Sequence, residues 1–334
     1  MNYIGSKYSL LDFIDKTVKS IVGEDMSQFV FCDLFAGTGI VGRHFKTQVK
    51  QVISNDWEYY SYILNRNYIG NHLEIEGKEG YIEKLNQLDG IENGFVFTQY
   101  CLGGGNERQY FSDENGKKID AARKAIEEWR CCGEISDNLY YFLLCSLIES
   151  ADKYANTASV YGAFLKRLKK TAQKPLVITP ASYQFNSHNH QVYCEDANTL
   201  INRISGDVLY LDPPYNARQY GANYHLLNTI AEYKAFVPKG KTGLRKYNKS
   251  NYCSKNTVKD SFESLVADAK FKYIVLSYNN EGLMSTETIQ QIMSKYGRYQ
   301  MFQREYSRFR ADKVENRNHI ANTTTEYLHV LIKE

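Results

Sequence analysis

Short apolar runs that end on a carboxylate alternate along this chain with stretches of helical periodicity. The acids that end four of these runs are Asp33, Asp56, Asp196 and Asp212. The run at 208–211, before Asp212, is continuously apolar, which is typical of a strand buried in a parallel sheet, and the other three runs also predict strands. Parallel neighbours end at the same edge of a sheet, so we expect the four carboxylates to line the edge where open α/β sheets bind their ligands. Further strands are predicted at 272–278 and 326–333.

Apolar residues recur at helical spacing in other stretches, and each of these predicts an amphipathic or buried helix. The stretches are 10–22, 119–129, 138–150, 160–172, 223–233 and 285–296. Asp137 is expected to cap the third of them, whereas the Gly-, Asn- and charge-rich residues 90–118 predict loops and turns. We therefore predict an α/β domain formed by residues 1–59 and 176–334, with a mostly helical insertion at 60–175.

A glycine-rich turn, Asp-Leu-Phe-Ala-Gly-Thr-Gly, ends the first strand at residues 33–39. Gly37 and Gly39 permit a tight turn and a close approach of the backbone to a ligand. Asp56 stands at the spacing expected of a ribose-binding acid, and capping of the following helix is an alternative role. The glycine-rich turn lacks the Gly-Lys-Ser/Thr of a phosphate loop, which disfavours a nucleoside triphosphate. S-adenosylmethionine fits better, because its cationic sulfonium would be attracted by the carboxylates.

Asp212 is followed by Pro213, Pro214 and Tyr215. The two prolines cannot continue a strand or a helix, so they should form a stiff ledge at the strand end. A carboxylate acceptor, free carbonyls and an aromatic ring on this ledge suit the binding of a planar ring that carries an amino group. On its own the tetrapeptide is also compatible with a plain strand and turn.

Composition and charge limit the classes of protein that this chain can belong to. The formal net charge is +3, so nucleic-acid binding would depend on local basic patches. The seven cysteines include no C-x-x-C pair, which favours unpaired thiols over zinc ligands or disulfides. The sequence lacks a signal-peptide pattern and any apolar window of the ~18 residues that a membrane span needs. It thus predicts a soluble intracellular protein with no metal site and no membrane partner.

One basic patch lies at 234–259, where eight Lys and Arg residues occur without an acid. Gly, Asn, Ser and Tyr are interleaved with them, so we predict a flexible loop that grips the phosphate backbone of a nucleic acid. A solvated loop kept basic for solubility is the alternative.

Five motifs occur in a fixed order: Asn-Tyr-Ile-Gly-Ser-Lys at 2–7, the glycine-rich turn, Asn-Asp at 55–56, Tyr-Cys-Glu-Asp-Ala at 193–197 and Asp-Pro-Pro-Tyr at 212–215. In this order they resemble the motifs of the Dam-like, D12 class of site-specific DNA adenine-N6 methyltransferases. The chain departs from that class where Tyr3 replaces the usual Trp and Ser6 the second glycine of Gly-Gly-Lys. The resemblance implies an α/β fold with a Rossmann-like, S-adenosylmethionine-dependent methyltransferase sheet, and an insertion that recognises the target.

The resemblance also implies roles for individual residues. Those implied in cofactor binding are Tyr3, Lys7, Asp33, Phe35, Ala36, Gly37, Gly39, Asp56, Trp57, Asp196, Ala197 and Asp212. The implied catalytic residues are Asp212, Pro213, Pro214 and Tyr215. The residues that we expect to contact DNA are Arg218, Tyr220, Asn223, Arg245, Lys246 and Lys249.

The implied activity is transfer of a methyl group from S-adenosylmethionine to adenine N6 in a specific double-stranded DNA sequence, with S-adenosylhomocysteine as the product. The target base would flip out of the duplex and attack the methyl group in line. Double-stranded DNA is the expected partner, and a separately encoded restriction endonuclease is left open as a second one. The expected location is the cytoplasm of a prokaryote, in association with the nucleoid, or a phage. The alternatives are methylation of RNA adenine, of cytosine N4 or of a protein glutamine, and a non-catalytic DNA-binding subunit of the same fold.

Overall fold

The computed structural model describes residues 7–307 and 323–334, and within them the chain forms two compact units. We call residues 7–57, 188–219 and 249–334 the sheet unit, and residues 58–187 with 220–248 the helical unit. The helical unit thus contains the predicted insertion and also a second segment, 220–248, which the sequence pattern had assigned to the α/β domain.

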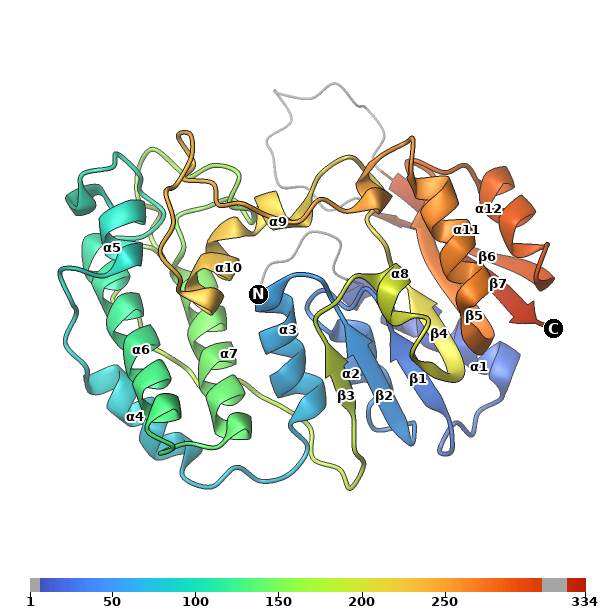
Figure 1. Ribbon diagram of the computed structural model, residues 1–334, viewed down its shortest axis with the longest axis horizontal. Coiled ribbons are helices and arrows are strands. Elements are labelled where there is room, and N and C mark those ends of the chain that lie inside the picture. Colours follow the sequence, from blue (N-terminus) through green and yellow to red (C-terminus); the bar gives the residue numbers. More distant parts are fainter. Residues whose placement is uncertain (1–6, 308–322) are drawn as a thin grey trace. The chain divides into compact units, whose positions relative to one another are not determined.

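The sheet unit is built on a sheet with the strand order β3-β2-β1-β4-β5-β7-β6 (Figure 1). Its strands are β1 (Val30–Asp33), β2 (Gln51–Asn55), β3 (Gln191–Tyr193), β4 (Ser205–Leu211), β5 (Lys270–Asn279), β6 (Gly297–Ser307) and β7 (Thr323–Lys333). Strands β1 to β5 pair in parallel, whereas β7 is antiparallel to both β5 and β6. The order is that of a doubly wound, Rossmann-like sheet extended by a hairpin, which confirms the predicted fold class.

Helices cover both faces of this sheet. They are the 3₁₀ turn η1 (Tyr8–Leu10), α1 (Leu11–Val22), α2 (Ile40–Phe45), α8 (Ala197–Leu200), the 3₁₀ turn η4 (Asn251–Cys253), α11 (Val258–Asp268) and α12 (Thr286–Met293). One core joins α8, α11 and α12 to Leu209 and Ile274 of the central strands. On the other face, the ring of Phe45 in α2 stacks on Phe31 of β1 with 4.2 Å between centroids. Alternate residues of each central strand thus enter one core or the other.

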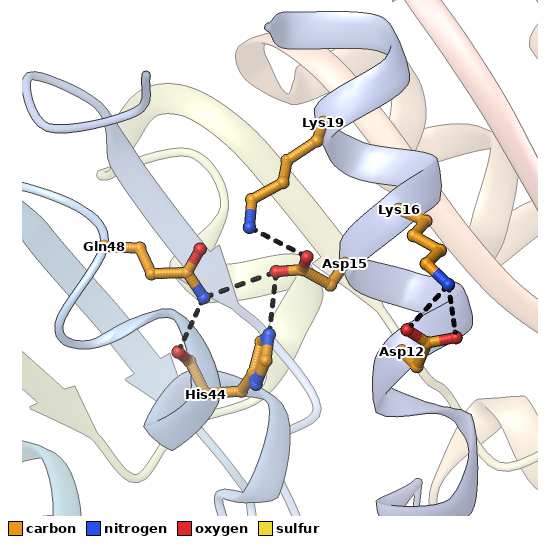
Figure 2. Close-up of polar contacts among 6 residues, drawn as sticks. All are labelled: Asp12, Asp15, Lys16, Lys19, His44 and Gln48. Carbon is orange, nitrogen blue, oxygen red and sulfur yellow. Dashed lines mark hydrogen bonds and ion pairs between the residues drawn. The ribbon is translucent and has the colours of Figure 1, made fainter. Parts of the chain in front are cut away.

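A group of polar side chains joins α1 to α2 (Figure 2). Asp15 of α1 accepts hydrogen bonds from His44 Nε2 at 2.8 Å, from Gln48 Nε2 at 3.3 Å and from Lys19 Nζ at 2.8 Å. Partial burial raises the pKa of Asp15, but these donors outweigh it and leave the pKa below its ordinary value. The contacts fix the two helices together on their face of the sheet.

The helical unit contains α3 (Tyr59–Asn65), a π-helical turn η2 (Arg66–Gly70), α4 (Lys78–Gln87), α5 (Phe95–Tyr100), a 3₁₀ turn η3 (Leu102–Gly104), α6 (Asp113–Cys131), α7 (Asp137–Tyr154), α9 (Tyr220–Asn223) and α10 (His225–Glu232). Helix α7 is buried along most of its length. Asp120 of α6 accepts hydrogen bonds from the N–H groups of Val96 and Phe97, at 2.9 and 2.7 Å, and so caps α5. No helix among the described residues combines the length and the apolar character that crossing a membrane requires.

Several local predictions were wrong. Residues 160–172 form turns rather than a helix, because the buried side chain of Asn156 donates to the carbonyls of Gln109 and Leu165 and accepts from the N–H of Lys169. The predicted loops at 90–118 include α5 and the first turns of α6. Helix α7 is capped by the side chain of Ser136, not by Asp137.

Candidate active site

The glycine-rich turn joins β1 to α2 at the carboxyl edge of the sheet. Gly37 and Gly39 have φ angles of 52° and 74°, in the left-handed region that favours glycine. Asp33 is 1% exposed and accepts a hydrogen bond from the Gly42 N–H at 2.9 Å, which ties the end of β1 to the first turn of α2. The Ala36 N–H donates to the Asn55 carbonyl at 2.9 Å, so the turn is also held by β2.

Asp56 follows β2 and accepts a hydrogen bond from the Gly37 N–H at 2.8 Å. Two motifs that are 19 residues apart in the chain therefore lie in contact. The alternative that Asp56 caps the next helix is wrong, because α3 begins at Tyr59 with Glu58 at its N-cap position.

The edge of the sheet next to β2 holds further residues that were implied in cofactor binding. Asp196 follows β3 and caps α8 by accepting a hydrogen bond from the Thr199 N–H at 3.0 Å. Ala197 is buried, while Trp57 is 36% exposed. The ring of Phe35 meets the buried ring of Tyr252 edge to face, 5.0 Å between centroids. Phe35 is thereby positioned by η4, an element far from it in the sequence.

The ledge at 212–215 begins directly after β4. The side chain of Asp212 is 19% exposed, Pro213 is buried, and Pro214 and Tyr215 are half-buried. The Tyr215 carbonyl accepts a hydrogen bond from the Leu283 N–H at 3.0 Å, and the Tyr215 ring packs on the core beneath α11. The ledge is therefore fixed by a backbone hydrogen bond and by the packing of its aromatic ring.

Lys7 links this ledge to the antiparallel strand β7. Its ammonium lies 3.1 Å from Asp212 Oδ1 and 2.8 Å from Glu326 Oε1. Glu326 also accepts a hydrogen bond from Ser277 Oγ at 2.6 Å. Lys7 is 5% exposed, Glu326 and Ser277 each 1%. The ion pairs therefore lie where water screens them weakly.

Burial and neighbouring charges change the proton affinity of the acids at this edge. Burial raises the pKa of Asp212 to about 6; Lys7 opposes this shift and Glu326 adds to it. Burial likewise raises the pKa of Asp33 to about 7, against the hydrogen bond from Gly42, with contributions from Asp212 and Asp56. Burial alone would lower the pKa of Lys7, but its carboxylate neighbours raise it well above the ordinary value. The edge thus holds a permanent cation among acids that resist ionisation, as catalytic sites often do.

The residues expected to contact DNA are divided between the units. Arg218 and Lys249 belong to the sheet unit, and the other four to the helical unit. Arg218, Lys246 and Lys249 are exposed. The ring of Tyr220 stacks on Tyr224, 6.1 Å between centroids. The carbonyl of Asn223 accepts a hydrogen bond from the Tyr161 N–H at 2.7 Å.

Part of the basic segment 234–259 is held by the helical unit rather than free. The buried guanidinium of Arg108 donates to the carbonyls of Gly240 and Lys241, at 3.1 and 3.2 Å. The Tyr100 hydroxyl donates to the Gly243 carbonyl at 2.8 Å. Arg245 forms an ion pair with Glu232 at 2.7 Å, with its side chain only 15% exposed. The prediction of a flexible loop was therefore wrong for residues 240–245.

The last two parts of the prediction concern the N-terminal motif and a metal site. Tyr3 and the rest of the motif before Lys7 lie outside the described residues. Within the described residues, no three His, Cys, Asp or Glu side chains are grouped so that they would hold a metal ion.

Sequence reasoning missed Glu326, Ser277 and Arg108. In the sequence, Glu326 was only the first residue of the predicted closing strand. Its position in the site depends on β7 running antiparallel to β5. That direction brings the start of β7 to the edge where the parallel strands end.

Comparisons with known proteins identify the family to which the chain is similar. A family profile described as "D12 class N6 adenine-specific DNA methyltransferase" matches residues 3–324. The Type II methyltransferase M.NlaIII of Neisseria lactamica is 62% identical over 333 residues, which cover 100% of this chain and 99% of that protein. The Type II methyltransferase M.CviAII of Paramecium bursaria Chlorella virus 1 is 36% identical, covering 98% of this chain and 97% of that protein.

A longer relative and a solved structure were also found. The Type II methyltransferase M.FokI of Planomicrobium okeanokoites is 39% identical over an alignment that covers 100% of this chain and 53% of that protein. The methyltransferase domain of bacterial CtHen1-C is 8% identical with a TM-score of 0.32, covering 96% of this chain and 95% of that one. This likeness is too weak to support a conclusion.

Proposed function

The chain belongs to the D12 class of N6 adenine-specific DNA methyltransferases, and from this premise we propose that residues 212–215 hold a flipped adenine while its N6 accepts the methyl group of S-adenosylmethionine. A base inside the duplex cannot present its amino group to a pocket, so it must leave the stack. The ring of Tyr215 would stack on it, and the stiffness of the two prolines would limit its movement.

Asp212 and the carbonyl of Pro213 are the proposed acceptors of the two hydrogens on the adenine amino group. Both acceptors concentrate electron density on N6 and orient its lone pair for in-line attack. Asp212 accepts in its ionised form, and the ammonium of Lys7 at 3.1 Å favours that form. No covalent intermediate with the enzyme is required.

The described residues suit S-adenosylmethionine, which supplies a methyl group activated by a cationic sulfur. Asp212 and Glu326 share the ammonium of Lys7 at this edge, so the edge has an excess of carboxylates over this cation. Such an excess attracts a cationic ligand in a region of weak screening. We assign the methionine end to the glycine-rich turn, the ribose to Asp56, and the adenine to the segment 196–197.

The biological setting is part of the proposal. The relatives named as Type II methyltransferases support a role in a restriction-modification system, in which methylation would protect DNA from a separately encoded endonuclease. The helical unit and the exposed cations Arg218, Lys246 and Lys249 are the proposed contacts to double-stranded DNA. Because DNA is the substrate, we place the enzyme with the nucleoid in the cytoplasm of a prokaryote, or with a phage.

The observation that carries this function is the carboxylate of Asp212, held by Lys7 at the end of β4 and followed by the fixed Pro-Pro-Tyr ledge. Replacing Asp212 with Ala should lower the rate of methyl transfer by at least the ~10²–10³-fold that removal of one preorganised polar contact costs. The measurement is incorporation of tritiated methyl groups into DNA, with calorimetry of cofactor binding to show that the site is intact. Near-normal incorporation by this variant would refute the assignment.

A further inference from the structure

Glu326 is a buried acid for which the proposed methyl transfer gives no individual role. It lies in β7 opposite Asn279 of β5, and 1% of its surface is exposed. Oε1 accepts hydrogen bonds from Lys7 Nζ at 2.8 Å and from Ser277 Oγ at 2.6 Å. Oε2 is buried and has no hydrogen-bond partner among the described residues. A carboxylate in such a position is costly, so its charge calls for a functional explanation.

The need of Lys7 for an anionic partner does not by itself explain why Glu326 is buried beside it. The carboxylate of Asp212 already lies 3.1 Å from the ammonium, and one carboxylate is enough to neutralise one cation. With Glu326 present, the ammonium of Lys7 is shared between two acids, and this buried cluster has an excess negative charge. Because the charge of Glu326 offsets part of the effect of Lys7 on Asp212, Asp212 stays a stronger proton acceptor than it would be in an exclusive ion pair.

The charged and titratable groups around Asp212 come from strands of the sheet unit and from the turns that follow them, and from Lys7 ahead of η1. Those with an electrostatic influence on this cluster are Lys7, Asp33, Asp56, Tyr210, Tyr215, Glu281 and Glu326. The largest influence on the pKa of Asp212 is burial, which raises it; Lys7 lowers this pKa and Glu326 raises it. Burial also raises the pKa of Tyr210 and Tyr215, which keeps both phenols neutral. Glu326 is therefore the anionic neighbour that opposes Lys7 at Asp212.

We propose that Glu326 is a positioning residue that shares the ammonium of Lys7 with Asp212 and thereby keeps Asp212 a strong acceptor for the amino hydrogens of the target adenine. The inference rests on the proposed role of Asp212. Glu326 acts through Lys7 rather than on the base, and Glu326 is itself held by the hydrogen bond from Ser277 of β5. An acceptor works best when its pKa lies near the working pH, and the excess carboxylate charge moves Asp212 in that direction.

The test is the pH dependence of single-turnover methyl transfer in Glu326→Gln, which removes the charge and keeps the shape and an acceptor for Ser277. We expect the acidic limb of the profile to move down by about one pH unit, because the like charge next to Asp212 is removed. The fraction of the plateau rate retained at pH 5 should rise from about one tenth to about one half. The plateau rate itself should fall, because Asp212 becomes a weaker acceptor.

Two variants serve as controls. Asp207→Asn removes a negative charge at the opposite end of β4, where Asp207 accepts a hydrogen bond from the Val30 N–H at 2.8 Å, and should leave the limb in place. Glu326→Met replaces the buried charge with an apolar chain of similar length, and carries the same expectation as Glu326→Gln if that variant does not fold. An acidic limb that stays in place or moves upward in the Glu326 variant would overturn the inference. If Asp212→Ala retained activity, by contrast, the proposed function itself would fail.

Discussion

Replacement of Lys7 with Met tests the electrostatics of the site most directly, because it removes the cation and keeps most of the volume. The ammonium lies 3.1 Å from Asp212 Oδ1, and the pKa of Asp212 with Lys7 present is raised to about 6 by burial. An opposite charge at such a distance lowers the pKa of an Asp by about 1–3 units, so its removal should move Asp212 to about 7–9. At pH 7 the ionised fraction would then fall from about 90% to between about 50% and 1%.

The assay is single-turnover methyl transfer between pH 5 and pH 10, with saturating cofactor and DNA. The wild-type rate should fall about tenfold per pH unit below pH 6, because a neutral carboxyl is a much weaker acceptor for the amino hydrogen than a carboxylate. In Lys7→Met the same fall should begin at about pH 7–9 and the rate should recover at higher pH. A variant that is slower by one constant factor at every pH would refute this reasoning, and Lys7 would then only support the fold.

Two further predictions concern binding. Asp56→Ala should weaken the binding of S-adenosylmethionine by about 1–3 kcal/mol, the usual cost of leaving polar groups without partners. If calorimetry gave an unchanged affinity, Asp56 would only hold the glycine-rich turn through its hydrogen bond from Gly37 and would not bind the cofactor. Replacing Lys246 and Lys249 with Ala should raise the DNA dissociation constant and flatten its salt dependence by up to about 0.9 for each phosphate group that is no longer bound, without changing the methylated sequence. Arg245→Ala should flatten the salt dependence less, because Arg245 already pairs with Glu232. If every variant kept the salt dependence of the wild-type protein, the basic segment would be a solvated loop without contacts to DNA.

The sequence determined the parallel part of the fold and most of the proposed site. Each carboxylate-ended run became a parallel strand: Asp33 is the last residue of β1, and Asp56, Asp196 and Asp212 follow β2, β3 and β4. This worked for the central strands β1 and β4 because their buried stretches are apolar up to the carboxylate at the strand end. The positive φ angles of Gly37 and Gly39 were likewise readable from residue type alone.

Local helix prediction failed where long-range contacts replaced the periodic pattern. Residues 160–172 have apolar side chains at helical spacing, but the backbone bonds of this segment go to Asn156 and to other distant partners. The segment 240–245 is polar and glycine-rich, but the carbonyls of Gly240 and Lys241 are bound by Arg108. The contacts of Arg108 span 132 and 133 residues, so the sequence around 240–245 gives no sign of them.

The charge balance around Asp212 was decided by tertiary structure alone. Lys7 and Glu326 are 319 residues apart, yet they share one hydrogen bond at the carboxyl edge of the sheet. The sequence marked Lys7 and Asp212 as parts of motifs, but it contained no indication that β7 would return antiparallel beside β5 and bring Glu326 to that edge. Motifs identify which residues take part in the chemistry, whereas the pairing of strands decides which charges stand next to them and how readily they hold a proton.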